Sequence, residues 1–170
     1  MKRMWSPWRS RHIGQTSAEA LNEGNRRDLF TRIAKDTDDE ENLVVFRGTR
    51  VYVVMNRFPY NNGHLLIVPY RQVENYEDLD EGELVEVARA IADCIRWLRS
   101  ALKPDGFNVG MNLGAAGGAG VPEHLHVHVV PRWSGDTNFM PTVADVKIIP
   151  EAMLETFRKV REAVKESGGG

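Results

Sequence analysis

The feature that most restricts the fold is a run from Glu123 to Trp133 in which histidine and apolar residues alternate. Three of the chain's five histidines occupy every second position of this run: His124, His126 and His128. Successive side chains of a β-strand point to opposite faces, so these imidazoles line one face of a strand. The other face is apolar and can pack on a core. The run therefore predicts a strand over 123–131 with titratable groups along one side.

A row of imidazoles on one strand has three interpretations. The first is a solvent-exposed strand face rich in histidine, and the second is a zinc site that takes two ligands from neighbouring strand positions. The third is a catalytic strand face with a nucleophilic or acid–base histidine. The flanking sequence favours the third. A glycine-rich run from Gly110 to Gly120 supplies backbone N–H groups suited to anions, and Arg132 suits phosphate oxygens. We therefore expect chemistry at phosphorus rather than metal-dependent hydrolysis.

The composition narrows the class of partner. The 170 residues are 42% hydrophobic and 27% charged, with a formal net charge of −2, so no general basic character points to nucleic acid. One domain over 1–170 is expected. No apolar run approaches the length of a membrane span, and the start of the chain has no apolar signal core, so we expect a cytoplasmic protein without membrane association. Cys94 is the only cysteine, which excludes an intramolecular disulfide.

Apolar periodicity predicts an α+β fold with an antiparallel sheet of about five strands. The strands are expected over 43–46, 51–55, 64–69, 107–113 and 123–131, the first two forming a hairpin and the third lying centrally. A further short strand or extended segment is expected over 144–149. Helices are expected over 28–35, 80–102 and 150–165. Segment 1–16 is interpreted as an irregular N-terminal arm and 167–170 as a flexible tail.

The long helix carries the clearest local signals. Asp80 and Glu83 form a capping-box pattern at its start, and Pro104-Asp105-Gly106 ends it. Helical spacing predicts an inward stripe of Leu84, Val87, Ala88, Ile91, Ile95, Leu98 and Leu102. On the last helix the same spacing predicts Met153, Leu154, Phe157, Val160 and Val164. Cys94 is expected to be a small buried apolar residue.

The alternating run, His124-Leu-His126-Val-His128-Val-Val, resembles the signature of the histidine-triad family, and the resemblance covers roughly Asn42 to Trp133. The longer run from Asn112-Leu-Gly-Ala-Ala-Gly-Gly to Gly135-Asp-Thr-Asn-Phe-Met-Pro is similar to the branch that includes bacterial diadenosine tetraphosphate phosphorylases. This resemblance implies a HIT-like fold, a homodimer with one continuous sheet, and nucleotidyl transfer through a covalent histidine intermediate.

The resemblance also implies a role for each histidine. His126 would attack the α-phosphorus of a nucleotide as a neutral imidazole, with its other ring nitrogen held against a backbone carbonyl. His124 and His128 would donate to phosphate oxygens or to the leaving oxygen. His64 would buttress the triad, although a strand-edge histidine satisfied by solvent is the alternative.

Further positions are expected to contact the nucleotide. Asn56 is assigned to the ribose, Asn112 to the phosphate region, and the N–H groups of Gly120 and Val121 to the phosphate. Arg132, Trp133 and Asn138, which follow the triad in the sequence, are expected near the base or polyphosphate. For Asn112 a plain strand-to-turn role is the alternative, and for Trp133 it is core packing.

Two departures from the family pattern affect the substrate. Asn56 stands where an acidic residue is common, and an amide offers the ribose one acceptor oxygen rather than two. The segment Ala119-Gly120-Val121-Pro122-Glu123 lacks a hydroxyl that would help to protonate a leaving group. Because a polyphosphate leaves more readily than an amine, this absence favours dinucleoside polyphosphates over phosphoramidates.

The expected reaction is therefore phosphorolysis of diadenosine tetraphosphate to ADP and ATP. Hydrolysis of dinucleoside polyphosphates or of adenosine 5'-phosphoramidates remains an alternative, as does a non-catalytic nucleotide- or zinc-binding module. A divalent ion such as Mg²⁺ is compatible with a polyphosphate substrate, and the sequence assigns no carboxylates to it and no other cofactor or metal.

Overall fold

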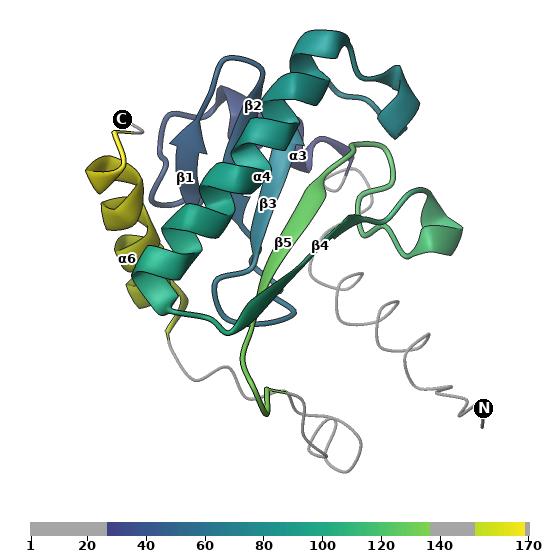
Figure 1. Ribbon diagram of the computed structural model, residues 1–170. Helices are drawn as coiled ribbons and strands as arrows, with labels where there is room; N and C mark the ends of the chain where they lie inside the picture. The colour runs from purple at the N-terminus through teal and green to yellow at the C-terminus, as the bar shows by residue number, and fades with distance from the viewer. Residues whose placement is uncertain (1–26, 137–151, 169–170) are drawn as a thin grey trace, which may run out of the picture.

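A single antiparallel sheet organises the part of the chain that the computed structural model describes, residues 27–136 and 152–168 (Figure 1). Its strand order is β1-β2-β3-β5-β4. The strands are β1 (Val44–Arg47), β2 (Val51–Met55), β3 (Leu65–Pro69), β4 (Gly106–Met111) and β5 (Val127–Arg132). Every neighbouring pair is antiparallel, and β3 lies in the centre as predicted. The α+β class is confirmed.

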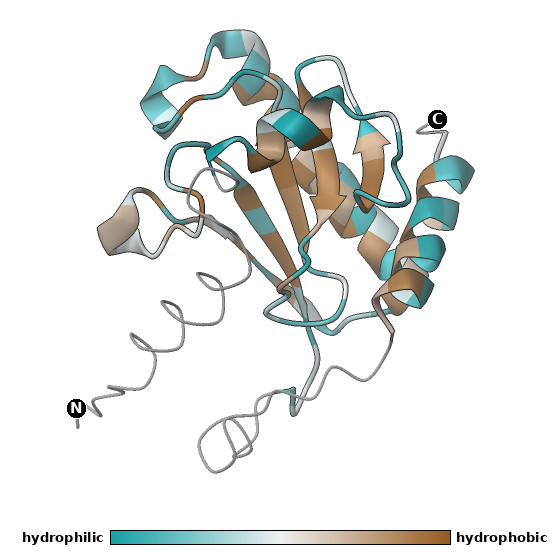
Figure 2. Ribbon diagram, turned by 180° about the vertical axis from the view of Figure 1, so that it is seen from behind, coloured by the Kyte–Doolittle hydropathy of each residue, from teal (hydrophilic) through white to brown (hydrophobic). Residues whose placement is uncertain are grey.

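The helices cover the two faces of this sheet unequally. The long helix α4 (Glu81–Leu102) and α6 (Met153–Glu166) pack together on one face, whereas the short helix α3 (Leu29–Lys35) crosses the other (Figure 2). Two single-turn 3₁₀ helices, η1 (Tyr76–Asp78) and η2 (Ala115–Gly117), lie in the connections. Among the described residues, no helix is long and apolar enough to cross a membrane.

The predicted capping box at the start of α4 is confirmed. The Asp80 side chain accepts a hydrogen bond from the Glu83 N–H (2.8 Å), and the Glu83 carboxylate accepts one from the Asp80 N–H (2.9 Å). The helix ends at Leu102, and Lys103 adopts a left-handed conformation (φ 50°). Pro104 follows, and a proline disfavours helical backbone in the residue before it.

The start of β5 differs from the prediction. The strand begins at Val127 rather than at residue 123, because the chain before it leaves the β3 ladder. The Leu125 N–H donates instead to the Val73 carbonyl (2.6 Å). The apolar side of the run is nevertheless buried as predicted, with Leu125, Val127 and Val129 in the core.

Two predicted inward positions are wrong. Ala88 of α4 is exposed, because the buried stripe runs through Val87, Ala90, Cys94 and Trp97 and then Leu98. Leu154 of α6 is 49% exposed. Cys94 is buried as expected, and this burial raises the pKa of its thiol. The predictions for 1–16, 144–149 and the start of the last helix at 150–151 lie outside the described residues.

Candidate active site

The strand register places His128 on the sheet face that α3 crosses. His128 lies beside Leu66 of β3 and Gly110 of β4, and Leu66 in turn lies beside Val54 of β2. Residues paired across antiparallel strands share a face, so the side chains of His128, Leu66 and Val54 form the floor of one cavity. The cavity has a volume of about 610 Å³ and is also lined by α3, the loop after β2, the segment 118–121 and His126.

His126 presents one ring nitrogen to this cavity. The residue is 6% exposed, and its Nδ1 lies 2.9 Å from the carbonyl oxygen of His124. A carbonyl only accepts, so Nδ1 must carry the proton and donate it. The lone pair is therefore on Nε2. Burial lowers the pKa of His126 below its ordinary value, which keeps the ring neutral near pH 7. This is the tautomer expected of a nucleophile.

The protonation of His128 is set by a chain of hydrogen bonds that starts at a backbone amide. The Tyr60 N–H donates to His64 Nδ1 (3.0 Å), so the His64 proton resides on Nε2. His64 Nε2 lies 2.9 Å from His128 Nδ1 and donates to it. His128 therefore carries its own proton on Nε2. Because His64 is fully buried, it is not the solvent-satisfied histidine of the alternative interpretation.

The Nε2–H of His128 is the group in the site that most needs a ligand. It is buried and finds no hydrogen-bond partner among the described residues. A buried donor without an acceptor costs about 1–3 kcal/mol, and a phosphate oxygen in the cavity would remove that cost. Burial, with a smaller contribution from His126, lowers the pKa of His128 to about 4. The ring is thus a neutral donor across the physiological range.

His124 does not have the donor role expected from the resemblance. Its Nε2 lies 2.9 Å from the Pro69 carbonyl oxygen and must donate to it. Its Nδ1 is then an acceptor, and it is buried without a partner in the described part of the chain. Burial also lowers the pKa of this ring, so a second proton is disfavoured. The backbone carbonyl of His124 instead accepts the hydrogen bond from His126 Nδ1 and so orients the His126 ring.

The expected nucleotide contacts divide into two groups. Asn56, Gly120 and Val121 line the cavity with the histidines. The Asn56 amide oxygen already accepts the Phe58 N–H (3.0 Å), so it is held in a fixed orientation. Asn112 is not among the lining residues; its amide reaches the Gly118 carbonyl (3.5 Å) across the glycine-rich loop, which fits the strand-to-turn alternative.

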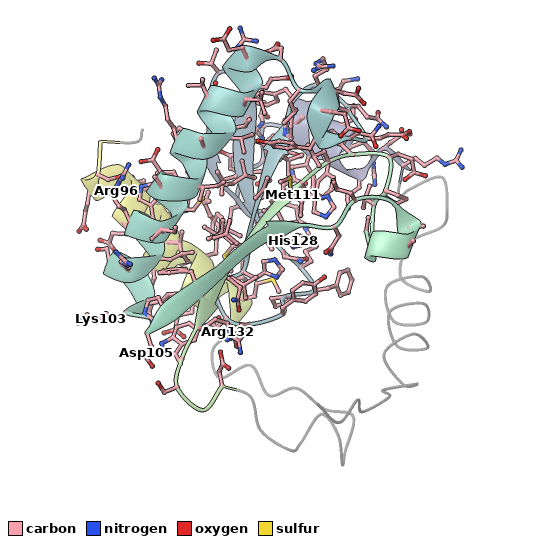
Figure 3. The ribbon with its side chains drawn as sticks, turned by 45° about the vertical axis from the view of Figure 1, so that its right-hand side comes forward. Arg96, Lys103, Asp105, Met111, His128 and Arg132 are labelled. Atoms are coloured by element: carbon pink, nitrogen blue, oxygen red, sulfur yellow. The ribbon has the colours of Figure 1, made fainter. Side chains whose placement is uncertain are left out.

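Arg132 and Trp133 lie away from the cavity. Figure 3 shows Arg132 at the opposite end of β5 from His128, near Asp105, and four residues of strand span ~13 Å. The Arg132 guanidinium makes two hydrogen bonds to the Asp136 carboxylate, at 2.6 and 2.7 Å, and the Trp133 N–H donates to the same carboxylate. Arg132 therefore stabilises the turn after β5 within this chain, and it is not among the residues that line the cavity. Asn138 lies outside the described residues.

Several lining residues were not anticipated as functional. Phe30 and Ile33 of α3 are buried in the core, and they also form one wall of the cavity. Phe30 packs against the rings of both His124 and His126, at centroid distances of 5.5 and 5.1 Å. Phe58 and Tyr60 of the loop after β2 line the mouth. The sequence signal that could have identified Phe58 and Tyr60 as functional is the presence of two aromatic residues within a loop rich in Pro, Asn and Gly.

The described residues contain no group of three or more His, Cys, Asp or Glu side chains arranged to hold a metal ion. In the triad itself, hydrogen bonds to carbonyls or to another ring occupy one nitrogen each of His124, His126 and His128.

Comparison with known proteins places this cavity in context. The HIT domain matches residues 37–135. The chain is 42% identical over 160 residues to the AP-4-A phosphorylase of Mycobacterium tuberculosis, covering 93% of this chain and 82% of that protein. It is 34% identical over 91 residues to a yeast bis(5'-adenosyl)-triphosphatase, covering 53% and 44%. Among solved structures, a hypothetical histidine triad nucleotide-binding protein from Sulfolobus tokodaii has a TM-score of 0.66 at 26% identity, covering 81% and 92%.

Proposed function

Because the chain belongs to the HIT domain family, we propose that it cleaves diadenosine tetraphosphate by phosphorolysis, through a nucleotidyl group carried on His126. One observation carries the proposal. The cavity holds a neutral imidazole whose Nδ1–H donates to a carbonyl, next to a second imidazole whose buried Nε2–H has no acceptor among the described residues. Nucleotidyl transfer needs a nucleophile next to a hydrogen-bond donor for the phosphate anion. The rings of His126 and His128 are in contact, with centroids 4.9 Å apart.

In the first step, the His126 Nε2 lone pair attacks the α-phosphorus of the bound dinucleotide. The N–P bond forms as the bond between that phosphorus and the bridging oxygen breaks, and ATP leaves. The ring becomes cationic, and its Nδ1–H continues to donate to the His124 carbonyl (2.9 Å). His128 Nε2–H stabilises the charge that develops on the phosphate oxygens. A polyphosphate leaves as a stable anion, so this step proceeds without the hydroxyl that the segment 119–123 lacks.

In the second step, inorganic phosphate attacks the same phosphorus. The new P–O bond forms as the N–P bond breaks, which releases ADP and returns His126 to its neutral state. Water in place of phosphate would give AMP. The similarity to a protein named AP-4-A phosphorylase, over 93% of this chain, supports phosphate as the acceptor and adenine dinucleotide as the substrate.

The assignment of the other residues follows from where they lie. Buried apolar side chains from α3, β2 and β3 line the inner part of the cavity and suit a base. Asn56 lines the same cavity, with its amide 3.4 Å from His64 Nδ1, and would bind the ribose. The N–H groups of Gly120 and Val121 would bind the phosphate oxygens.

The decisive experiment uses isotopes to follow both steps. With ¹⁸O-labelled phosphate, phosphorolysis places the label in the β-phosphate of ADP; with ¹⁸O-labelled water, hydrolysis places it in AMP. A dinucleotide that is chiral at the α-phosphorus then separates mechanisms, because two in-line displacements retain configuration and one inverts it. Mass spectrometry of protein quenched during turnover should find one nucleotidyl group on His126.

Each part of the proposal can fail separately. Label in AMP alone would replace phosphorolysis by hydrolysis and leave the histidine intermediate standing. Inversion at phosphorus, or full turnover by His126→Ala, would remove the covalent intermediate. Faster cleavage of adenosine 5'-phosphoramidate than of the dinucleotide would favour the phosphoramidase alternative, and no turnover at all would favour a binding module.

We also propose a homodimer joined through β4. This strand lies at the end of the sheet order, with one neighbouring strand in the described part of the chain, and Val109, Met111 and Leu113 are exposed along and just beyond it. Unpaired backbone groups on such an edge are a template for a second strand. The cytoplasm, where nucleotides and phosphate are both plentiful, is the proposed compartment.

A further inference from the structure

The loop between β2 and β3 places two large aromatic rings in solvent at the mouth of the histidine cavity. Phe58 is 52% exposed and Tyr60 is 51% exposed, and both line the cavity together with His126 and His128. Exposed apolar surface of this kind costs solubility and, when it rims a cavity, marks a binding surface. Neither ring has a task in the two chemical steps described above.

Tyr60 lies directly beside the catalytic histidines. Its ring stacks on His128, with centroids 5.5 Å apart and planes 14° from parallel, and contacts His64 at 4.8 Å. His128 in turn contacts His126. The tyrosine is thus two ring contacts from the nucleophile while about half of it stays in solvent. A planar group bound to its open side would extend the stack that His128 begins.

The loop that carries these rings is fixed at both ends. The Asn61 side-chain amide donates to the Pro131 carbonyl (3.0 Å) and to the Asp136 carboxylate (2.8 Å). The Tyr60 N–H is bound to His64, and the Phe58 N–H to Asn56. Gly63 has φ +71°, and a Cβ at this position would lie 2.4 Å from Leu102 Cδ1. A surface held in this way loses little conformational entropy when it binds a ligand.

The inner part of the cavity accommodates one half of a dinucleotide. A volume of about 610 Å³ is in the range for a single drug-sized ligand. The inner, buried apolar walls, from Phe30, Ile33, Val54 and Leu66, suit one base. A dinucleoside polyphosphate has two bases, so the second must lie outside the inner compartment, beyond the histidines.

We propose that Tyr60, with Phe58 beside it, is the stacking platform for the second base, the one that departs with the leaving nucleotide. This inference rests on the proposed cleavage of a dinucleotide. The platform makes the enzyme selective for leaving groups that end in a nucleoside, because base–aromatic stacking is tolerant of base identity. It acts on specificity and takes no part in the transfer of the nucleotidyl group.

Two substrates of equal charge test the platform. One is diadenosine tetraphosphate. The other is adenosine 5'-tetraphosphate with a methyl ester on its terminal phosphate, which keeps the phosphates and lacks the second nucleoside. The preference is the ratio of the two kcat/KM values, measured for the wild type, Tyr60→Leu, Phe58→Leu and Tyr60→Trp. Tyr76→Leu is the matched control, because Tyr76 is a part-exposed tyrosine of η1 that does not line the cavity.

We expect the wild type to prefer the dinucleotide by about five- to a hundredfold, the range of base–aromatic stacking. Tyr60→Leu should lower this preference by about fivefold or more, with a smaller decrease for Phe58→Leu. Tyr60→Trp should keep the preference or raise it, and Tyr76→Leu should leave it unchanged. Any loss caused by altered packing on His128 affects both substrates and cancels in the ratio.

Three results would overturn the platform: no preference in the wild type, an unchanged preference in Tyr60→Leu, or an equal loss of preference in the Tyr76→Leu control. None of these touches the proposed function. A nucleotidyl group trapped on His126 with the methyl ester as substrate would show that the covalent chemistry stands even if the platform does not.

Discussion

At the scale of single residues, three identical side chains acquire three different roles through their hydrogen bonds. The His126 proton is fixed on Nδ1, the His128 proton on Nε2, and the His124 proton is donated to Pro69. Each assignment follows from a carbonyl or an amide at the end of a short chain, since a carbonyl only accepts and an N–H only donates. The protonation of the site is thus set by three backbone groups, the carbonyls of His124 and Pro69 and the N–H of Tyr60.

His64 is expected to act through His128 as a positioning residue. His64→Phe removes the donor to His128 Nδ1 and frees the ring to change tautomer, so kcat should fall by about 10²- to 10⁴-fold. His64→Gln retains a side-chain N–H near the former Nε2 and should lose less. Steady-state kinetics measure the effect, and ¹⁵N NMR reports the tautomer of His128. Equal losses in both variants with an unchanged tautomer would contradict this role.

The buried triad should make the fold sensitive to acid. The pKa of His128 is about 4 in the folded chain and 6.5 in the unfolded chain, so below pH 6.5 the unfolded state binds more protons. The stabilisation is complete above pH 6.5 and is lost as the pH falls towards 4, by about 2–3 kcal/mol at pH 4.5.

Urea unfolding at pH 7.5 and 4.5 measures this loss as the difference between the wild type and His128→Asn, since carboxylates contribute equally to both proteins. The same pH dependence in the two proteins would show that His128 does not titrate as described.

The expected contact between one ring nitrogen of His126 and a backbone carbonyl is present, but the sequence pattern could not separate His124 from its neighbours. Strand alternation treats the three positions as equivalent, whereas the chain bends away before Val127 and turns His124 towards Pro69. Residue type alone also could not identify the partner of Arg132 within the chain. The guanidinium group suits phosphate oxygens, but in this structure it pairs with the carboxylate of Asp136, four residues later in the sequence. Pairing over such short distances depends on turn geometry that composition does not encode.

At the scale of elements, α4 was predicted almost to the residue because its signals are local. The capping box satisfies N–H groups that the first turn leaves unpaired. Apolar spacing was less exact: Ala88 is exposed because bulky Trp97 and Leu98, not alanine, decide which stripe faces the sheet. The start of β5 depends on a hydrogen bond to Val73, about 50 residues earlier in the sequence, and a local pattern cannot contain it.

Substitutions at Asp80 should separate the contribution of the α4 N-cap to stability from the contribution of the Asp80–Arg50 ion pair. Asp80 also contacts Arg50 (3.1 Å) in an exposed pair, which contributes little. Asp80→Ala removes both interactions, whereas Asp80→Asn removes the charge and keeps an acceptor for the Glu83 N–H. We expect Asp80→Ala to lower the free energy of unfolding by about 1 kcal/mol and Asp80→Asn by clearly less. Urea titration measures both, and equal values would assign the effect to the ion pair.

At the scale of the whole molecule, the two edge strands of the sheet differ in how readily they can pair with a strand of another chain. At one edge, β1 has an irregular register between Val44 and Phe46, and the guanidinium of its last residue, Arg47, donates to carbonyls of α3 and the following turn. Bulges and charged residues of this kind discourage pairing with another chain. At the other edge, β4 is regular over all six of its residues and carries neither lysine nor proline. The second edge is therefore available for a partner strand.

This asymmetry predicts that charges on β4 break the proposed dimer. Val109 and Met111 are 44% and 36% exposed, and a lysine at each would place like charges at the two-fold axis of an isologous interface, where both copies contribute the same patch. Analytical ultracentrifugation should find a dimer for the wild type and a monomer for Val109→Lys/Met111→Lys. The control is Leu154→Lys, which charges an equally exposed apolar position on α6 and should remain dimeric. A wild type that sediments as a monomer at all concentrations, or a doubly charged variant that stays dimeric, would show that the copies do not join through this edge.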